Sequence, residues 1–212
     1  MLCYTGITCL DCGSDLKFKD DRSSEIIVYS DNGSSTMKHK IKECSNRQCR
    51  NHYHYSHFTR KNSFVTGHSL AKYYYKEASK NVIFMATCAT AFFTSFLASI
   101  LTNMMLCPEY SFYQRANAFN ISVSDGNDQL DRRRLAEAFF QYALLEMLSF
   151  YLPERELIQT AFSFDLDWNL LKFTPLLKDQ FQIFHAKHRC DTPGCRTVIG
   201  FDADCKVSFC DY

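Results

Sequence analysis

The feature that most restricts the fold of this chain is a set of cysteine pairs near its two ends. Two or four residues separate the members of each pair, a spacing at which one tight turn presents two thiolates to the same ion. A tetrahedral zinc ion takes four such ligands, so two neighbouring pairs make one site. The pairs predict two zinc ions, and their members are Cys9 and Cys12, Cys44 and Cys49, Cys190 and Cys195, and Cys205 and Cys210.

A predicted β-hairpin joins the first two pairs. Residues 25–30 have the β-branched and aromatic content of a strand, and DNGSS at 31–35 is a turn sequence. Residues 36–44 then alternate apolar side chains with lysines, as a strand with one solvated face does. A tight turn with a cysteine pair (a zinc knuckle), a hairpin and a second knuckle follow one another, as in a zinc ribbon. Cys3 competes with Cys9 as a ligand, and histidines after Cys49 offer another, but we expect the four paired cysteines.

The second predicted site lies close to the C-terminus. A Pro-Gly turn between Cys190 and Cys195 directs these two thiolates toward each other, and RTVIGF after it is a short strand. Cys205 and Cys210 complete this site. His188 is an alternative ligand in place of Cys205, and the spacing does not decide between them.

Cysteine usage also indicates the redox compartment. The chain has eleven cysteines, an odd number, in short paired spacings, and its first residues lack the pattern of a secretory leader. Thiolates that bind metal in a reducing compartment explain this pattern better than a disulfide framework does. We therefore expect an intracellular protein.

Between the cysteine clusters the hydrophobic period becomes helical. We expect successive helices, of which the one after the DGND loop begins at an acidic cap and two open at prolines. The sequence predicts an α+β fold with an N-terminal zinc-ribbon-like β-hairpin in residues 1–66, a central helical bundle in 67–187 and a small Cys-rich zinc-binding β element in 188–212. The predicted helices are 82–106, 109–119, 129–151, 153–162 and 175–188.

One of these helices raises the question of a membrane. Residues 81–108 contain no charged side chain, and that length can span a hydrocarbon core of about 30 Å. Serine, threonine and asparagine dilute the hydrophobicity, and the following helices need an apolar partner. We therefore favour a helix buried in the protein over a membrane span.

Basic residues are concentrated in one segment of a nearly neutral chain. The formal net charge is +1, but residues 38–81 carry ten Lys and Arg against two Asp and Glu, a balance of +8. Tyrosines and histidines in the same segment offer rings for base stacking. DNA phosphates are one interpretation, and the solvated face of a hairpin is the other. The candidate nucleic-acid contacts are Lys38, Lys40, Lys42, Arg47, Arg50, Arg60 and Lys61.

Catalytic motifs are missing from the sequence. It contains no Gly-rich phosphate loop, no His-Glu-x-x-His and no serine elbow, and Asp125, Asp128 and Asp131 lie where acidic residues stabilise a helix start. We expect no enzyme and no small-molecule substrate. The leading interpretation is a zinc-binding, DNA-associated module in the nucleus, and the alternative is a zinc-stapled helical scaffold that binds other proteins.

The order of the motifs resembles the cysteine-cluster modules associated with KDZ (Kyakuja-Dileera-Zisupton) transposases. The matching segments are the first Cys-x2-Cys pair, KECSNRQCRNHYHYS, VIFMATCATAFFTSFL, SFYQRANAFN, RRLAEAFFQYALLEML and HRCDTPGC. The resemblance implies a zinc-binding accessory region of a mobile element that helps to bind DNA, without the ribonuclease-H-like catalytic domain. It carries over six candidate ligands, namely Cys9, Cys12, Cys44, Cys49, Cys190 and Cys195.

Overall fold

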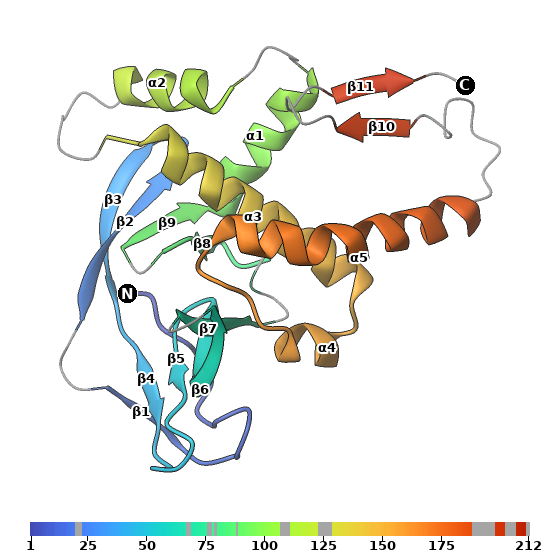
Figure 1. Ribbon diagram of the computed structural model, residues 1–212. Coiled ribbons are helices and arrows are strands. Elements are labelled where there is room, and N and C mark those ends of the chain that lie inside the picture. Colours follow the sequence, from blue (N-terminus) through green and yellow to red (C-terminus); the bar gives the residue numbers. More distant parts are fainter. Residues whose placement is uncertain are drawn as a thin grey trace.

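Two β-sheets and a layer of helices form the body of the protein (Figure 1). The computed structural model describes residues 1–19, 23–66, 69–75, 78, 80–87, 89–106, 111–122, 129–187, 198–201 and 207–210.

The four-stranded sheet has the order β3-β2-β9-β8. β2 pairs antiparallel with β3 and parallel with β9, and β8 pairs antiparallel with β9. Alternate side chains of β2 enter different cores: Ile26 and Val28 pack on one face and Tyr29 on the other. The strand bounds are Ser24–Ser30 for β2, Gly33–His39 for β3, Ile83–Met85 for β8 and Thr90–Phe93 for β9.

The five-stranded sheet has the order β1-β4-β5-β6-β7, and every pair in it is antiparallel. Its first three strands are only two or three residues long, so few ladder hydrogen bonds hold this end. The bounds are Leu16–Phe18 for β1, Lys42–Cys44 for β4, His52–Tyr53 for β5, His57–Thr66 for β6 and Ser69–Tyr74 for β7.

One long hairpin links the two sheets. The β2–β3 ladder runs from the turn at Ser30 and Gly33 to the pair Ser24 and His39, and the β1–β4 ladder resumes beyond the break. In between, the Lys19 amide donates to the Ile41 carbonyl at 3.0 Å. The predicted hairpin is therefore present. Its half next to the turn, β2 and β3, belongs to the four-stranded sheet, and the half farther from the turn, β1 and β4, belongs to the five-stranded sheet.

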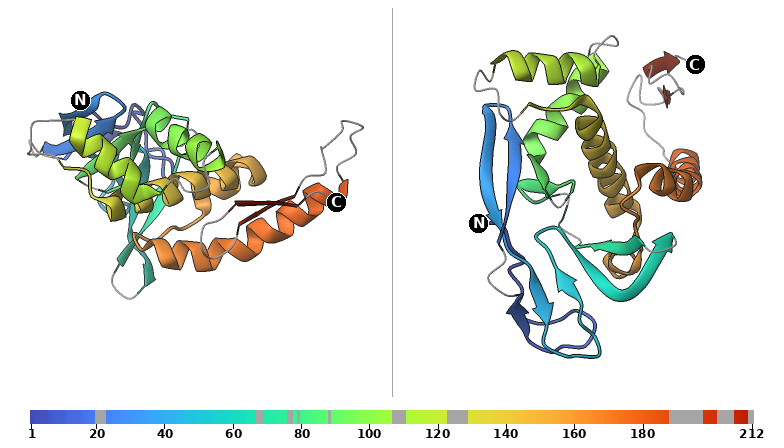
Figure 2. Two further views of the ribbon diagram at one scale, coloured as in Figure 1. Left: turned by 90° about the horizontal axis from the view of Figure 1, so that it is seen from above. Right: turned by 60° about the vertical axis from the view of Figure 1, so that its left-hand side comes forward.

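Helices cover one face of the four-stranded sheet. α1 and α3 lie against this sheet, and α5 lies on the outer side of α3 (Figure 2). Asp131 caps α3, and its carboxylate accepts from the amides of Arg133 and Arg134. The main core joins all of these layers through aromatic and aliphatic side chains. The helix bounds are Thr94–Leu106 for α1, Phe112–Ser122 for α2, Arg132–Tyr151 for α3, Glu154–Gln159 for α4 and Leu166–Lys187 for α5.

The predicted fold is wrong in its architecture, although the class is α+β. The chain does not form a zinc-ribbon hairpin followed by a helical bundle, and most of the predicted second zinc element lies outside the described residues. Instead, two sheets of five and four strands occupy residues up to 93, and five helices follow in the described part of the chain. The cysteine group that the structure brings together lies in the N-terminal region.

The predicted helix at 82–106 is a helix only from Thr94 onward. Residues 83–85 and 90–93 are β8 and β9, and β9 lies at the centre of its sheet between β2 and β8. A strand buried on both faces shows a continuous apolar run, which the sequence alone does not distinguish from a buried helix. No helix among the described residues has the length and apolar character needed to cross a membrane.

Two features near the C-terminus also differ from expectation. α5 begins at Leu166, nine residues before the predicted start, and Pro175 lies inside it. Beyond α5, β10 (Val198–Phe201) and β11 (Val207–Cys210) form an antiparallel pair. His188, Cys190, Cys195 and Cys205 lie outside the described residues, as does the side chain of Cys210.

Candidate metal centre

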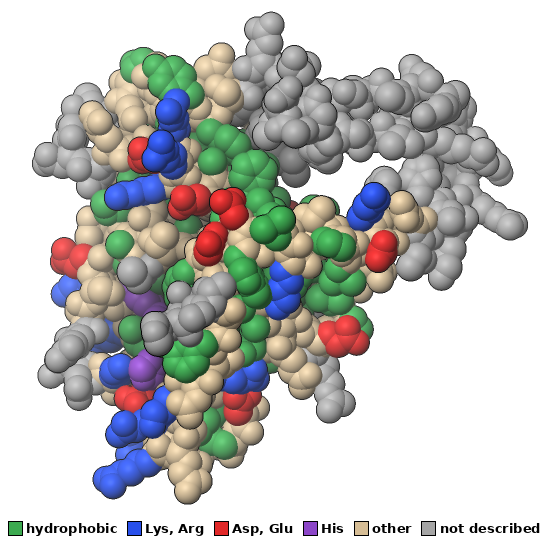
Figure 3. Space-filling model, in the orientation of Figure 1, with side chains coloured by type: hydrophobic (Ala, Val, Ile, Leu, Met, Phe, Trp, Pro, Cys, Tyr) green, Lys and Arg blue, Asp and Glu red, His purple; other side chains and the backbone are tan. Residues whose placement is uncertain are grey.

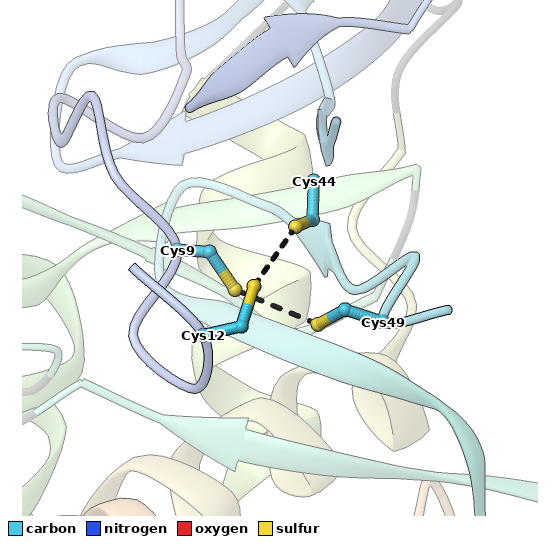
Figure 4. A group of neighbouring side chains, drawn as sticks. All are labelled: Cys9, Cys12, Cys44 and Cys49. Atoms are coloured by element: carbon cyan, nitrogen blue, oxygen red, sulfur yellow. Dashed lines mark hydrogen bonds between the residues drawn. The ribbon is translucent and has the colours of Figure 1, made fainter. Parts of the chain in front are cut away.

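Four cysteine sulfur atoms converge at the far end of the five-stranded sheet (Figure 4). The Sγ atoms of Cys9, Cys12, Cys44 and Cys49 all lie within 4.8 Å of one another. The Cys9 and Cys49 sulfurs are 3.6 Å apart, and those of Cys12 and Cys44 are 3.4 Å apart. A disulfide needs about 2.05 Å, so these are four separate thiols.

The first cysteine pair lies in a closed loop. The Gly13 amide donates to the Cys9 carbonyl at 2.9 Å, and the Cys9 amide donates to the Ser14 carbonyl at 2.8 Å. Gly13 has a φ of +71°, a backbone conformation in which a residue without Cβ is not strained. The turn therefore directs the Cys9 and Cys12 side chains to the same side of the loop.

The second pair is set by a turn that begins at the end of β4. The amides of Cys49 and Arg50 donate to the Asn46 carbonyl at 3.1 and 3.0 Å, and the Cys44 amide donates to the Asn51 carbonyl at 2.9 Å. Arg50, directly after Cys49, has a φ of +47°. It occupies the position that Gly13 occupies after Cys12. In both loops, therefore, the residue after the second cysteine has a left-handed backbone conformation.

A carboxylate between the first two thiols connects the loops to the sheet. Asp11 accepts two hydrogen bonds from the Arg60 guanidinium, at 2.7 and 2.9 Å, and one from the Asn51 side-chain amide at 2.8 Å. The Arg60 hydrogen bonds hold the pKa of Asp11 below its ordinary range. Asp11 therefore connects the loop of Cys9 and Cys12 to β6 and to Asn51, which follows the loop of Cys44 and Cys49.

Aromatic side chains form the floor of the centre. Tyr53 is fully buried, its hydroxyl donates to the Cys9 sulfur at 3.2 Å, and it accepts from the Leu10 amide at 2.8 Å. The Tyr53 ring stacks on Tyr4 and Phe58, with centroids 5.2 and 5.3 Å away. The thiols thus lie between solvent and a packed aromatic core.

The four thiols differ in their acidity. Hydrogen bonds from Ser14 lower the pKa of Cys12 to about 6, whereas burial raises the pKa of Cys49 to about 11 and raises that of Cys44 further. Four thiolates at this separation would repel one another, so without a cation some of them keep their protons. A bound cation removes this conflict, and the protons leave when it binds.

The donor set fits a tetrahedral metal ion with thiolate ligands. With metal–sulfur bonds of about 2.3 Å, the edge of a sulfur tetrahedron is about 3.8 Å. The separations of 3.4 and 3.6 Å lie close to this value, and all the sulfurs lie within 4.8 Å of one another. Four thiolates are the ligands of zinc and of iron–sulfur centres. The group could therefore hold one metal ion, with Cys9, Cys12, Cys44 and Cys49 as its ligands. Cys3 is not part of it.

Three of the predicted nucleic-acid contacts gather beside the metal centre. Arg47, Arg50 and Lys61 are exposed and line two adjoining hollows, together with Lys19 and Glu43. Lys and Arg side chains are visible over this end of the molecule in Figure 3.

The other four predicted contacts are placed differently. Arg60 pairs with Asp11, and its guanidinium lies 4.0 Å from the centroid of the Tyr73 ring. Lys42 donates to the Gly6 carbonyl at 2.8 Å, Lys40 is half-buried, and Lys38 is exposed on β3 of the other sheet. The basic segment is therefore not one continuous surface.

Several residues of this region were not predicted from sequence. Asp11 supports the thiols, and Lys17 and Lys19 add charge to the hollows. Tyr53 was expected among the rings for base stacking, but it is buried and its hydroxyl donates to the Cys9 sulfur instead. An acidic residue between two paired cysteines and the alternation Lys-Phe-Lys at 17–19 were visible signals. What they contact depends on pairing between distant strands.

Comparison of the chain with protein-family models, with curated proteins and with solved structures finds no match. The resemblance to modules associated with KDZ transposases therefore stays a prediction.

Proposed function

We propose that this chain is a non-catalytic zinc-binding module that associates with DNA through its phosphate backbone. The convergence of four cysteine sulfurs from two loops carries the zinc part of the proposal. Zinc is the ion that sites of four cysteines in a reducing compartment hold most often, and it needs no open coordination position for a structural role.

The position of the sulfurs supports a structural role for this zinc. The ion connects a loop near the N-terminus to the end of a sheet whose first three strands are very short. Such a small sheet edge gains much of its stability from a cross-link of this kind. Zinc thereby fixes the backbone from which Arg47 and Arg50 project.

The association with DNA is supported by the cations around the centre. Among the described residues no carboxylate pairs with Arg47, Arg50 or Lys61, so these side chains are available to phosphates. The resemblance to transposase-associated modules points to the same partner and to a nuclear location. Contacts to phosphates make affinity depend steeply on salt.

Salt titration of DNA binding tests this function. We expect binding of a labelled DNA at low salt that weakens steadily as salt rises, and a smaller salt dependence for the double variant Arg47→Gln, Lys61→Gln. The exposed and distant Lys178→Gln serves as the control. Absence of binding at low salt, with zinc bound, would refute the association with DNA.

A second candidate function is a protein-interaction scaffold in which zinc only stabilises the fold. Large apolar side chains on the helices favour it, because Phe150 of α3 and Leu171 of α5 are 73% and 80% exposed. This candidate predicts self-association that is independent of DNA and is reduced by Phe150→Ser and Leu171→Ser. Sedimentation of the protein without nucleic acid distinguishes the two functions.

A further inference from the structure

The four thiols of the metal centre differ in their access to solvent. Cys12 is exposed and Cys49 is half-buried. Cys9 and Cys44 are each only 3% exposed. Tyr53 lies against Cys9 from the core side, and its hydroxyl donates to the sulfur at 3.2 Å. A small oxidant that arrives from solvent therefore meets the Cys12 sulfur first.

Two close sulfur–sulfur contacts join one loop to the other (Figure 4). The Cys12 sulfur lies 3.4 Å from that of Cys44, and the Cys9 sulfur lies 3.6 Å from that of Cys49. The two contacts share no atom, so all four thiols are used. A disulfide bond needs about 2.05 Å, which each pair reaches by an approach of about 1.4–1.6 Å. The arrangement therefore favours two disulfides, each of which crosses between the loops.

Hydrogen bonds hold the two loops together independently of a metal ion. Asp11, between the first two cysteines, accepts from the side-chain amide of Asn51 at 2.8 Å and from the guanidinium of Arg60. The Ser45 amide, directly after Cys44, donates to the Asp15 carbonyl at 3.0 Å. These contacts do not involve the sulfurs, so they persist when the thiols react. Each cysteine of the first loop therefore keeps its neighbour in the second loop during oxidation.

We infer that the metal centre is a redox switch, in which hydrogen peroxide oxidises Cys12 first, the disulfides Cys12–Cys44 and Cys9–Cys49 form, and zinc is released. The inference rests on the zinc part of the proposed function and adds a regulation to it. In the oxidised protein two covalent links replace the metal link between the loops. Thiol reductants reverse the change, because they reduce disulfides by exchange and restore the four ligands.

The reaction balances with one peroxide for each disulfide. The Cys12 thiolate attacks a peroxide oxygen, the O–O bond breaks, and the products are a sulfenic acid and hydroxide. The Cys44 sulfur then attacks the Cys12 sulfur, the S–O bond breaks, and a second hydroxide leaves. Two protons convert both hydroxides to water, so two thiolates are oxidised and one peroxide is reduced. Loss of two of the four ligands releases the zinc ion, and Cys9 and Cys49 react with a second peroxide in the same way.

Release of zinc from the zinc-loaded protein tests the first half of this inference. Hydrogen peroxide is added in the presence of a chromogenic zinc chelator, and the absorbance reports the zinc released. We expect the wild-type protein to release one zinc ion more than Cys49→Ala, which lacks one of the four ligands. Cys3→Ala, which changes a half-buried cysteine outside the group, should release as much zinc as the wild-type protein. A thiol reductant followed by zinc should restore the original zinc content.

Mapping of the disulfides by mass spectrometry tests the second half. Cleavage before Asp11 separates Cys9 from Cys12, and cleavage after Arg47 separates Cys44 from Cys49, so each cysteine of the group lies on its own peptide. We expect the Cys12–Cys44 pair to appear at the lowest peroxide concentrations and the Cys9–Cys49 pair to follow.

The outcomes distinguish the switch from the proposed function. Any other pairing as the main product, including disulfides within a loop, would overturn the inference, as would release of zinc with sulfinic acids in place of disulfides. Zinc retained in excess peroxide also overturns the switch but leaves the zinc-binding module intact. A wild-type protein that holds no more zinc than Cys49→Ala before oxidation overturns both.

Discussion

At the scale of single residues, the two loops that carry the four cysteines share a left-handed backbone conformation but place different residues in it. Each second cysteine is followed by a residue with positive φ, which is Gly13 in one loop and Arg50 in the other. A residue with a Cβ pays about 1 kcal/mol or more for this conformation. Glycine does not, although it has more freedom to lose on folding.

Replacing this arginine with glycine tests the strain. Arg50→Gly should leave the free energy of unfolding unchanged or raise it by up to about 1 kcal/mol, because the relief of strain offsets the extra entropy of glycine. Arg47→Gly, in the same turn but without positive φ, should lower it by about 0.5–1 kcal/mol. Urea unfolding of both zinc-loaded variants checks this. Equal losses in the two would show that Arg50 is not strained.

At the scale of elements, the Asp11–Arg60 pair fastens the first knuckle to β6. Arg60→Lys keeps the charge but cannot form both hydrogen bonds, so it should cost about 1 kcal/mol of knuckle stability. Transfer of the metal to a chelator should then become about fivefold faster. Lys61→Met, at the next position of β6 and exposed, is the control. If both variants lose metal at the rate of the wild-type protein, Arg60 has no such role.

A column of imidazole rings connects the two sheets. His39 of β3 stacks on His54 at 5.4 Å between centroids, and His54 stacks on His57 of β6 at 4.6 Å. His39 and His57 are buried, and His39 Nε2 and His54 Nδ1 have no hydrogen-bond partner among the described residues. Burial lowers the pKa of His54 to about 3 and that of His57 well below its ordinary value. The column is therefore neutral at physiological pH.

This column should make the fold sensitive to acid. In the unfolded chain these rings take up protons near pH 6.5, whereas in the folded protein they remain unprotonated at that pH because burial lowers their pKa. Their contribution to stability is therefore complete above about pH 6.5 and decreases as the pH falls below it, by up to about 1.4 kcal/mol per pH unit for each ring. NMR titration of the imidazoles checks this independently of the thiols. His54 and His57 should stay neutral down to about pH 5, and midpoints near 6.5 in the folded protein would contradict it.

At the scale of the whole molecule, the sequence predicted those features that depend on residues close together in the chain. The spacings of the first two cysteine pairs located the group of four thiols that could hold a metal, and alternation located the long hairpin. The helical period located α3, although its cap is Asp131 and not a residue of the DGND loop. Each of these signals is complete within a few residues of the feature that it predicts.

Pairing between segments far apart in the sequence explains the errors in the predicted fold and in the predicted nucleic-acid contacts. β9 pairs in parallel with β2 from 60 or more positions away, and burial on both faces hides its strand period. Counting charges in a segment does not show that Arg60 faces Asp11 or that Lys42 reaches the Gly6 carbonyl. The two hollows beside the thiols depend on Lys17 to Lys19 lying beside β4, which is set by the same hairpin that assembles the thiols.

The most direct test of the zinc centre is the native mass spectrum of the wild-type protein, of Cys49→Ala and of Cys3→Ala. Cys49 is one of the four converging thiols, whereas Cys3 is a half-buried cysteine outside the group. We predict that Cys3→Ala carries as much zinc as the wild-type protein and that Cys49→Ala carries one zinc ion less. Equal zinc in all three proteins would contradict a metal centre at the end of the five-stranded sheet.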